Sequence, residues 1–367
     1  MDLADFSNSN GAFYAPTFLV KVNGQSLTHT LGVAVPQVEV DLALGAAGRF
    51  SFTAANTFSD SQHAFLTAYG QPVLELLKFG ATVEIALGYG DFSRLPTLIT
   101  GTITEITTSF SEGGSPELTV AGYDGLFPLT LGKQSRNWKN ITDSGVISNL
   151  ASEYGLDADI QTTQEVHAQI EQNQESDFEL MKKLADRNYF EFYVSSSKKL
   201  RFGKPNDKSD GIVDLLWGRT LLNFKPEANL AAQVSQVEVY GWDPQQKKAI
   251  VGKAVAGDES GRDPRRQSGG ERLRAVVRKA PVLQVRQPVF TTAEADRRAK
   301  AILNEHAKNF LTGEAESIGL PDLQPDRNIN LGNLGDPFSK TYYIQQTTHK
   351  VDGSGYRTRV KVKETSL

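Results

Sequence analysis

The chain has 367 residues, of which 39% are hydrophobic and 22% charged, and its formal net charge at pH 7 is −4. These values are typical of a soluble globular protein of two or three domains, and the small negative charge argues against a general nucleic-acid binder. Cysteine is absent, which excludes disulfide bonds, thiolate catalysis and cysteine zinc sites, and no apolar run approaches the roughly 20 residues of a membrane span.

Residues 1–125 are predicted to form a first domain rich in strands. A short helix is expected at residues 72–79, because Pro72 lies at its start and Gly80 follows its end. Alternation of polar and apolar residues predicts strands at 18–22, 35–42, 49–54, 82–87, 98–110 and 117–122. Short strands with turn residues between them favour a barrel or a sandwich, so we predict a β-barrel interrupted by a helix.

Residues 126–205 are predicted to form a small α+β domain. Thr142 or Asp143 is a candidate N-cap for a helix that ends near Gly155. A second helix is expected after Ser176, because acidic residues follow this candidate cap and apolar residues then recur at helical spacing. That helix leads into aromatic strands at 189–194 and 199–202.

Residues 206–367 are predicted to return to β-structure as a second barrel. A long helix is expected from Thr291 or Thr292 to about Asn309. Residues 257–271 hold Gly, Ser, Asp, Pro and Arg with almost no apolar side chain, which is typical of a mobile surface loop.

Two segments far apart in the chain resemble each other. Residues 103–110 and residues 344–351 are each followed by a Gly-rich turn and a second strand, and each hairpin closes its predicted β-domain. If the similarity is structural, the chain holds two copies of one barrel around the middle domain.

Four segments, in this order along the chain, carry a resemblance to a known family. They are Gly122-Tyr123-Asp124-Gly125-Leu126-Phe127, the helix at 142–156, the helix-strand unit at 176–203 that ends in Leu200-Arg201-Phe202-Gly203, and Phe338-Ser339-Lys340-Thr341-Tyr342-Tyr343-Ile344 followed by His349 and Gly355-Tyr356. Together they resemble the phage late-control protein D and VgrG hub family of contractile injection systems. Lys340 departs from the pattern, since such proteins often have Gly there.

The resemblance implies an α+β, mainly β fold, with two similar antiparallel tube-like β-barrel domains flanking the small α+β domain. It implies a homotrimer whose six barrels match the six-fold ring of an inner tube protein and whose other face seats a three-fold spike. Because the chain stops at Leu367 directly after the closing hairpin, the spike is expected to be a separate protein. The other expected partners are baseplate components. The expected location is the bacterial cytoplasm during assembly and then the tail or injection particle.

The sequence marks no catalytic, cofactor or metal site. The five histidines are far apart, and no HExxH, GxSxG or P-loop pattern is present, so we expect a structural protein and not an enzyme. Two other functions stay open: a baseplate-associated cell-wall hydrolase and a carbohydrate-binding β protein.

One basic concentration is a candidate site. It comprises Arg262, Arg265, Arg266, Arg272 and Arg274, with Arg278 and Lys279 beyond them. It is either a solvated loop and strand edge or a docking loop for an acidic partner such as a baseplate component. Nucleic acid is the weaker alternative, because no aromatic residues are interleaved there.

Overall fold

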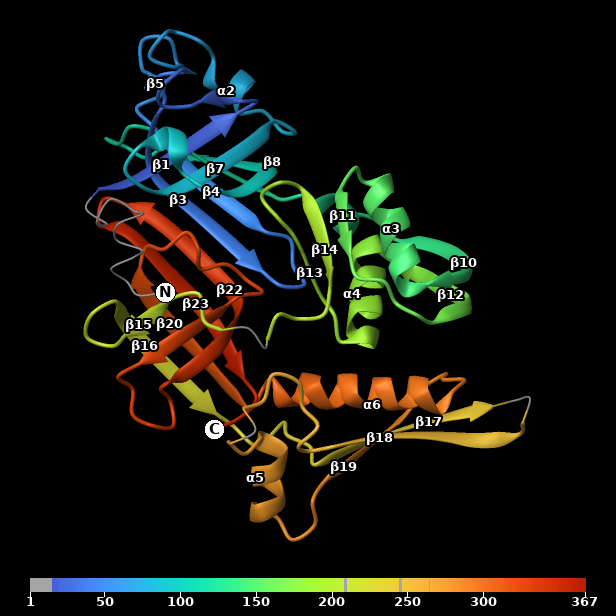
Figure 1. Cartoon of the computed structure of the whole chain (residues 1–367). Coiled ribbons are helices and arrows are strands. Elements are labelled where there is room, and N and C mark those ends of the chain that lie inside the picture. The colour runs from blue at the N-terminus through green and yellow to red at the C-terminus, as the bar shows by residue number, and fades with distance from the viewer. Residues whose placement is uncertain (1–14, 208–209, 244–245, 264) are drawn as a thin grey trace.

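The structure is a computed structural model that describes residues 15–207, 210–243, 246–263 and 265–367. It has three groups of elements, a first β-module, a middle α+β domain and a second β-module with an insertion (Figure 1). Strands hold far more residues than helices, which confirms an α+β, mainly β protein. No helix among the described residues is long and apolar enough to cross a membrane.

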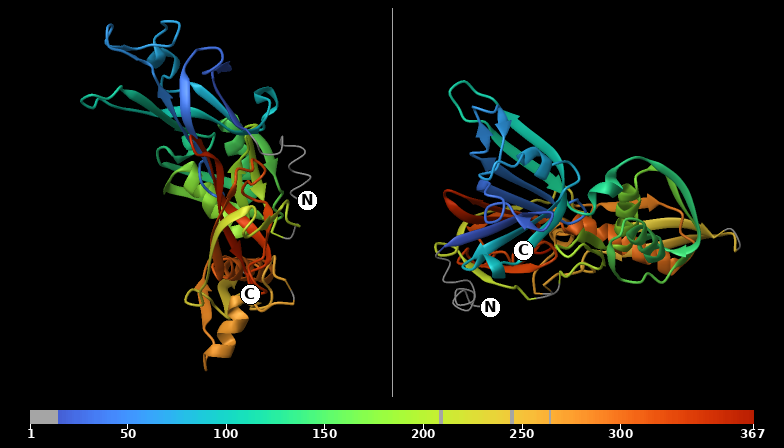
Figure 2. Two further views of the ribbon diagram at one scale, coloured as in Figure 1. Left: turned by 90° about the vertical axis from the view of Figure 1, so that its left-hand side faces the viewer. Right: turned by 90° about the horizontal axis from the view of Figure 1, so that it is seen from above.

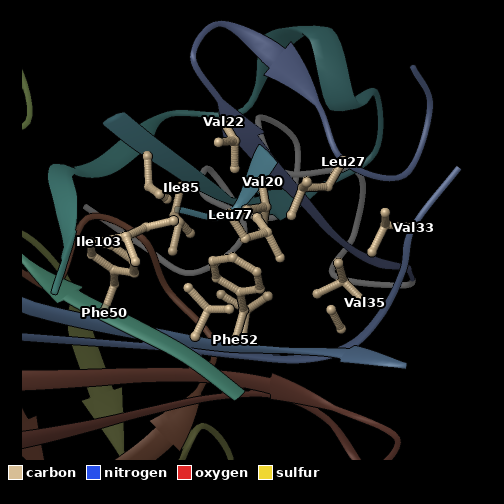
Figure 3. Packing of buried hydrophobic residues seen from close by; sticks show 14 of the residues in the cluster. Val20, Val22, Leu27, Val33, Val35, Phe50, Phe52, Leu77, Ile85 and Ile103 are labelled. Carbon is tan, nitrogen blue, oxygen red and sulfur yellow. The ribbon is translucent and has the colours of Figure 1, made fainter. Parts of the chain in front are cut away.

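The first module packs its strands around an apolar core. Its elements are β1 (Pro16–Val22), β2 (Gln25–Ser26), β3 (Ala34–Ala43), β4 (Arg49–Ala55), β5 (Phe58–Ser59), β6 (Ala64–Phe65), α2 (Val73–Leu76), β7 (Thr82–Tyr89), η2 (Phe92–Arg94), β8 (Thr97–Ser109) and β9 (Glu117–Tyr123). Phe50, Phe52 and Ile85 are buried at its centre (Figure 3). The predicted strands are confirmed, and the predicted helix is reduced to the single turn of α2.

The middle domain places two helices against two small sheets. Its elements are η3 (Phe127–Thr130), β10 (Gln134–Thr142), α3 (Asp143–Glu153), β11 (Asp157–Ile160), β12 (Val166–Glu175), α4 (Asp177–Asn188), β13 (Glu191–Val194) and β14 (Lys199–Gly203). The caps of both helices are confirmed, because Thr142 accepts from the Gly145 amide and Ser176 forms a capping box with Glu179. Helix α4 ends with Tyr189 in the left-handed region at φ 54°, so the strand predicted from 189 begins at Glu191.

The second module contains β15 (Asp214–Leu216), β16 (Leu221–Ala228), β20 (Leu311–Ile318), β21 (Asn328–Gly332), β22 (Lys340–Asp352) and β23 (Gly355–Glu364). Between β16 and β20 the chain leaves the module and builds the insertion, which consists of β17 (Gln236–Asp243), β18 (Lys248–Val255), α5 (Gly269–Val276), β19 (Val282–Arg286) and α6 (Thr292–Ala307). Helix α6 covers one face of the insertion's sheet (Figure 1). The contact is so close that a Cβ on Gly252 would lie 2.1 Å from the Ala295 carbonyl carbon.

Helix α5 corrects one prediction. The loop was expected to extend to Glu271, but a helix already begins at Gly269, and Ser268 and Glu271 form its capping box. The Ser-x-x-Glu pattern that predicts such a helix start is present in the sequence, but the polar composition of the surrounding residues favoured a loop.

The two β-modules share one sheet of 13 strands. The main path runs β16-β20-β23-β22-β3-β4-β9-β8-β7-β1-β2, and β15 and β21 branch from β22. The predicted pair of closed barrels is not seen among the described residues. Strand β22 instead joins the modules side by side, as the neighbouring blue and red strands of Figure 1 indicate.

Candidate assembly surface

The candidate functional site is the shared sheet, because its strands repeat. In the first module β3, β4, β9 and β8 are consecutive antiparallel neighbours, and in the second module β16, β20, β23 and β22 are paired in the same way. The first half of β8 also pairs with β7, as the first residues of β22 pair with β21. These strands follow one another in the same order along both modules, so the similarity predicted from the hairpins extends to a four-stranded unit.

Irregularities in the ladders fix which residues are equivalent. The β8–β9 register shifts between Ile103 and Glu105, and the β22–β23 register shifts between Ile344 and Gln346. Aligning these shifts makes Thr107 equivalent to Thr348 and Phe110 equivalent to Val351. Following the ladders across each unit then makes Asp41 equivalent to Glu227 and Val38 equivalent to Phe224.

The units also differ outside the four strands. Strand β1 runs antiparallel to β7, whereas β15 runs parallel to β21. The first module fills the gap between β4 and β7 with β5, β6 and α2, and the second carries its insertion between β16 and β20. The duplicated part is therefore the sheet itself.

The two units are joined head to tail. Strand β22, the last strand of the second unit, pairs with β3, the first strand of the first unit, over Gln346↔Ala43 to Val351↔Val38. This leaves β16 at one end of the eight-stranded series and β8 at the other. Identical head-to-tail contacts are the kind that build closed rings from repeated units.

One face of the eight-stranded series is polar. Side chains of opposite charge pair on it. Arg359 lies 3.1 Å from Glu316 and Lys361 lies 3.9 Å from Glu314, across the neighbouring strands β23 and β20. Arg49 of β4 reaches over β9 to Glu105 of β8, at 3.5 Å. The opposite face contributes the buried side chains of both module cores. The polar face therefore carries side chains of both charge signs.

The junction between the units is tightly packed. Val351 and Tyr356, from the tip of the β22–β23 hairpin, are each 4% exposed and belong to the core of the first module. Beside them His349 is completely buried, with its Nδ1 2.9 Å from the Tyr356 hydroxyl and its Nε2 2.9 Å from the Leu323 carbonyl. Burial lowers the pKa of His349 to about 4, so this histidine is neutral at pH 7.

The predicted basic cluster is divided by the structure. Arg262 forms an ion pair with Glu271 at 2.6 Å, Arg274 donates to the Ser235 carbonyl at 2.6 Å, and Arg272 donates to the Leu367 carbonyl. Arg262 and Arg274 make these contacts within the insertion, and Arg272 joins the insertion to the last residue of the chain. Arg265 is 87% exposed and pairs with Asp263, and Arg266 contacts both Asp263 and Asp336.

Arg262, Arg265 and Arg266 line a polar cavity of about 660 Å³ that also contains Lys340 and Glu364. Burial lowers the pKa of Lys340 to about 8, and its Nζ donates to the Ser366 carbonyl at 2.6 Å. The residue that departs from the family pattern thus helps to hold the last residues of the chain.

Other candidate residues do not come together. Among the described residues no group of three or more His, Asp or Glu side chains is placed to hold a metal ion. His306 lies in the last turn of α6, where its Nδ1 is 2.7 Å from the Ala232 carbonyl. The side chain of His167 is only 11% exposed and lies 3.3 Å from Asp143, because β12 pairs with β10, which leads into helix α3.

Residues 14–353 match a family model described as the Alg8 N-terminal domain. The chain belongs to this family. No curated protein sequence matches the chain.

The fold of this member of the Alg8 N-terminal domain family is similar to the folds of several solved structures. The 43 kDa tail protein of prophage MuSo2 from Shewanella oneidensis is 14% identical with a TM-score of 0.70, over 95% of this chain and 98% of that one. A tail protein from Neisseria meningitidis MC58 is 15% identical with a TM-score of 0.68, over 96% and 97%. The E. coli c3393 protein, described as a type VI secretion system component that resembles T4 tail proteins gp27 and gp5, is 13% identical with a TM-score of 0.56, over 95% and 77%. The expected fold of tail and injection proteins is confirmed.

The residues that define the assembly surface were only partly visible in the sequence. The hairpins at 103–121 and 344–362 pointed to the repeat, but Phe224 and Glu227 of β16 were not recognised as counterparts of Val38 and Asp41. The signal lies in the strand ladders, because the insertion separates β16 from the rest of its unit in sequence.

Proposed function

We propose that this chain is the structural hub of a contractile injection particle, and that three copies join the six-fold inner tube to a three-fold spike carried by a separate protein. In this proposal the chain acts as a late-control protein D or VgrG-like hub with a structural and not a catalytic role. The particle is a phage tail, a tailocin or an injection system.

The duplicated four-stranded unit is the observation that carries the proposal. A subunit with two similar units, joined head to tail, presents two similar docking faces to a neighbouring ring. Three such subunits present six faces, so a trimer meets a six-fold ring without breaking either symmetry. The differences outside the unit leave the remaining surfaces repeated only three times, which suits a three-fold spike.

The fold of the similar solved structures supports the particle assignment. Two of them are tail proteins, and a third is described as a type VI secretion component. Arg265, which is 87% exposed, and its neighbour Arg266 remain the candidate docking point for an acidic baseplate component.

Native mass spectrometry of the purified chain tests the proposal. The expected species is a trimer of about 121 kDa, three times the chain mass of 40.2 kDa. Mixed with the tube and spike proteins of its own particle, the trimer should bind both at once. A chain that stays monomeric and ignores both proteins would contradict a hub role.

A further inference from the structure

We propose that the polar cavity between the second module and the insertion binds a small molecule with a phosphate group, held by Lys340, Lys363 and the Thr365 hydroxyl. The site is separate from the hub function, because it lies within one chain and needs no tube protein, spike protein or second copy.

The cavity lies where the end of the chain meets the insertion. Its volume is about 660 Å³. Tyr343 and Lys363, which pair across β22 and β23, line it from the module, and residues 260–263, 265 and 266 line it from the insertion. A bridge joins Ser366 to Ser268, and the C-terminus in Figure 1 and in the left view of Figure 2 lies between the red strands of the module and the orange insertion. A cavity of this volume is large enough for a small-molecule ligand.

Lys363 brings an unpaired positive charge to the cavity. It is partly buried, and its ammonium group makes no hydrogen bond or ion pair with any described residue. Burial lowers the pKa of Lys363, and the neighbouring acids Glu305 and Glu191 only partly oppose this effect. Glu191 is already paired with Lys308 at 2.6 Å. A partly buried charge without a partner is costly, and a bound anion would remove that cost.

Lys340 is a second cation with unused donors. Its Nζ donates to the Ser366 carbonyl at 2.6 Å, which uses one of the three N–H groups of the ammonium. No carboxylate within the described part of the chain lies at ion-pair distance from it. Burial lowers the pKa of Lys340 to about 8, and repulsion from Arg266 contributes. An anion beside Nζ would favour the charged form, and lysine is a common ligand of phosphate groups.

Thr365 adds a buried hydroxyl that lacks a partner. Thr365 lines the cavity and is only 7% exposed, and its Oγ1 has no hydrogen-bond partner among the described residues. It follows Lys363 by two positions at the end of β23, so the alternation of a strand puts both side chains on the same face. Buried hydroxyl groups are nearly always hydrogen-bonded, so the missing partner indicates a ligand. A phosphate oxygen accepts hydrogen bonds from a hydroxyl and from an ammonium group alike.

The charges that line the cavity leave it positive. Among the described residues, six basic and four acidic side chains line it. One of the acids, Asp210, is exposed. The other three accept hydrogen bonds from the chain itself: Asp263 from Arg265 at 3.0 Å, Glu364 from the Ser366 amide at 3.0 Å, and Asp207 from the Tyr189 hydroxyl at 3.2 Å.

Inorganic phosphate and pyrophosphate test the site in the unmodified full chain. Each should raise the melting temperature by roughly 2–5 °C relative to sodium chloride at the same ionic strength, because a ligand that binds only the folded state stabilises it. Isothermal titration calorimetry with pyrophosphate then gives the affinity to which variants are compared. A melting temperature that neither probe raises above its value in chloride would overturn the proposal.

Lys363→Gln should weaken pyrophosphate binding about tenfold or more. It should not lower the melting temperature without phosphate, since it removes a partly buried charge that lacks a partner. Thr365→Val keeps the shape of the side chain and removes only the hydroxyl, so it should weaken binding about two- to tenfold, again without a loss of stability.

Lys361→Gln is the matched control. Lys361 lies on the same face of the same strand, but its side chain is 59% exposed and 3.9 Å from Glu314, so this variant should bind pyrophosphate as the unmodified chain does. An equal loss of binding in Lys361→Gln and Lys363→Gln would show a general effect of surface charge and overturn the site. A Lys363→Gln protein that melts below the unmodified chain without phosphate would also overturn it, because the chain itself would then stabilise the lysine.

Discussion

Ile103 and Ile344 occupy the same place in two hairpins, each immediately before the shift in the strand ladder. Register irregularities of this kind bend a strand and change its direction. The same register shift at the same place in both hairpins is therefore strong evidence for one repeated unit. The equivalence assigns counterparts to the paired residues of the four strands in each unit.

The contact between Phe50 and Gly122 should limit substitutions on β9. They face each other in the ladder, and a Cβ on Gly122 would lie 2.0 Å from the Thr102 carbonyl oxygen and 2.6 Å from the Phe50 ring. Gly122→Ala should therefore cost about 1–3 kcal/mol of unfolding free energy, measured by urea denaturation. Gly353→Ala, where a Cβ would meet nothing within 4 Å, should change it by less than about 0.5 kcal/mol.

The capping box of α4 should contribute to stability through Ser176. Its hydroxyl accepts from the Glu179 amide at 3.1 Å, and the Glu179 carboxylate accepts from the Ser176 amide at 2.7 Å. Ser176→Ala should cost about 1 kcal/mol of unfolding free energy. Ser176→Asp keeps an acceptor for the amide and should recover most of the loss; equal losses in both variants would show that the cap contributes little.

His349 should make stability depend on pH. Its pKa of about 4 in the folded protein lies below the ordinary value of 6.5, because burial disfavours the charged ring. The folded state therefore binds fewer protons than the unfolded state between these values. The contribution is complete above about pH 6.5 and is lost as the pH falls to 4, by at most about 3 kcal/mol.

The His349→Gln variant isolates this effect, since glutamine has a donor and an acceptor but no proton to titrate. Its unfolding free energy should be lower than that of the unmodified chain at pH 7, and the gap should narrow toward pH 4. Asp124, whose pKa burial raises to about 7, titrates with the opposite sign, but it is present in both proteins and cancels in the difference. A gap that is constant with pH would contradict a neutral buried ring.

The basic cluster should separate into docking and structural residues. Arg265→Glu changes an exposed side chain, so the fold and the trimer should persist while an acidic baseplate component binds more weakly in pull-down from assembled particles. Arg274→Glu removes a donor to the Ser235 carbonyl and should lower the melting temperature instead. Unchanged particle assembly with Arg265→Glu/Arg266→Glu would remove the docking role.

Local features were predictable from the sequence because their causes are local. Thr142, Ser176 and Thr291 all cap the helices expected after them, since capping needs only a side chain and the amides of the next turn. Helix α5 was missed in a segment whose composition resembled a loop, although its cap obeyed the same rule.

Long-range pairing was not predictable in this way. The alternation of a strand sets which side chains face the core but not which strand lies beside it. The hydrogen bond between Thr348 and Asp41 joins residues 307 positions apart in sequence, and it belongs to the β22–β3 pairing that makes one sheet where two barrels were expected. In the same way, the sequence does not show that Arg272 and Arg274 bind backbone carbonyls. The carbonyls, of Leu367 and Ser235, lie 95 and 39 residues away along the chain.

Cryo-electron microscopy of the assembled chain, reconstructed without imposed symmetry, tests the central claim most directly. The account predicts three copies around one axis, whose six similar β-units lie in one ring. An assembly with another number of copies, or three copies whose β-units do not lie in one ring of six, would contradict it.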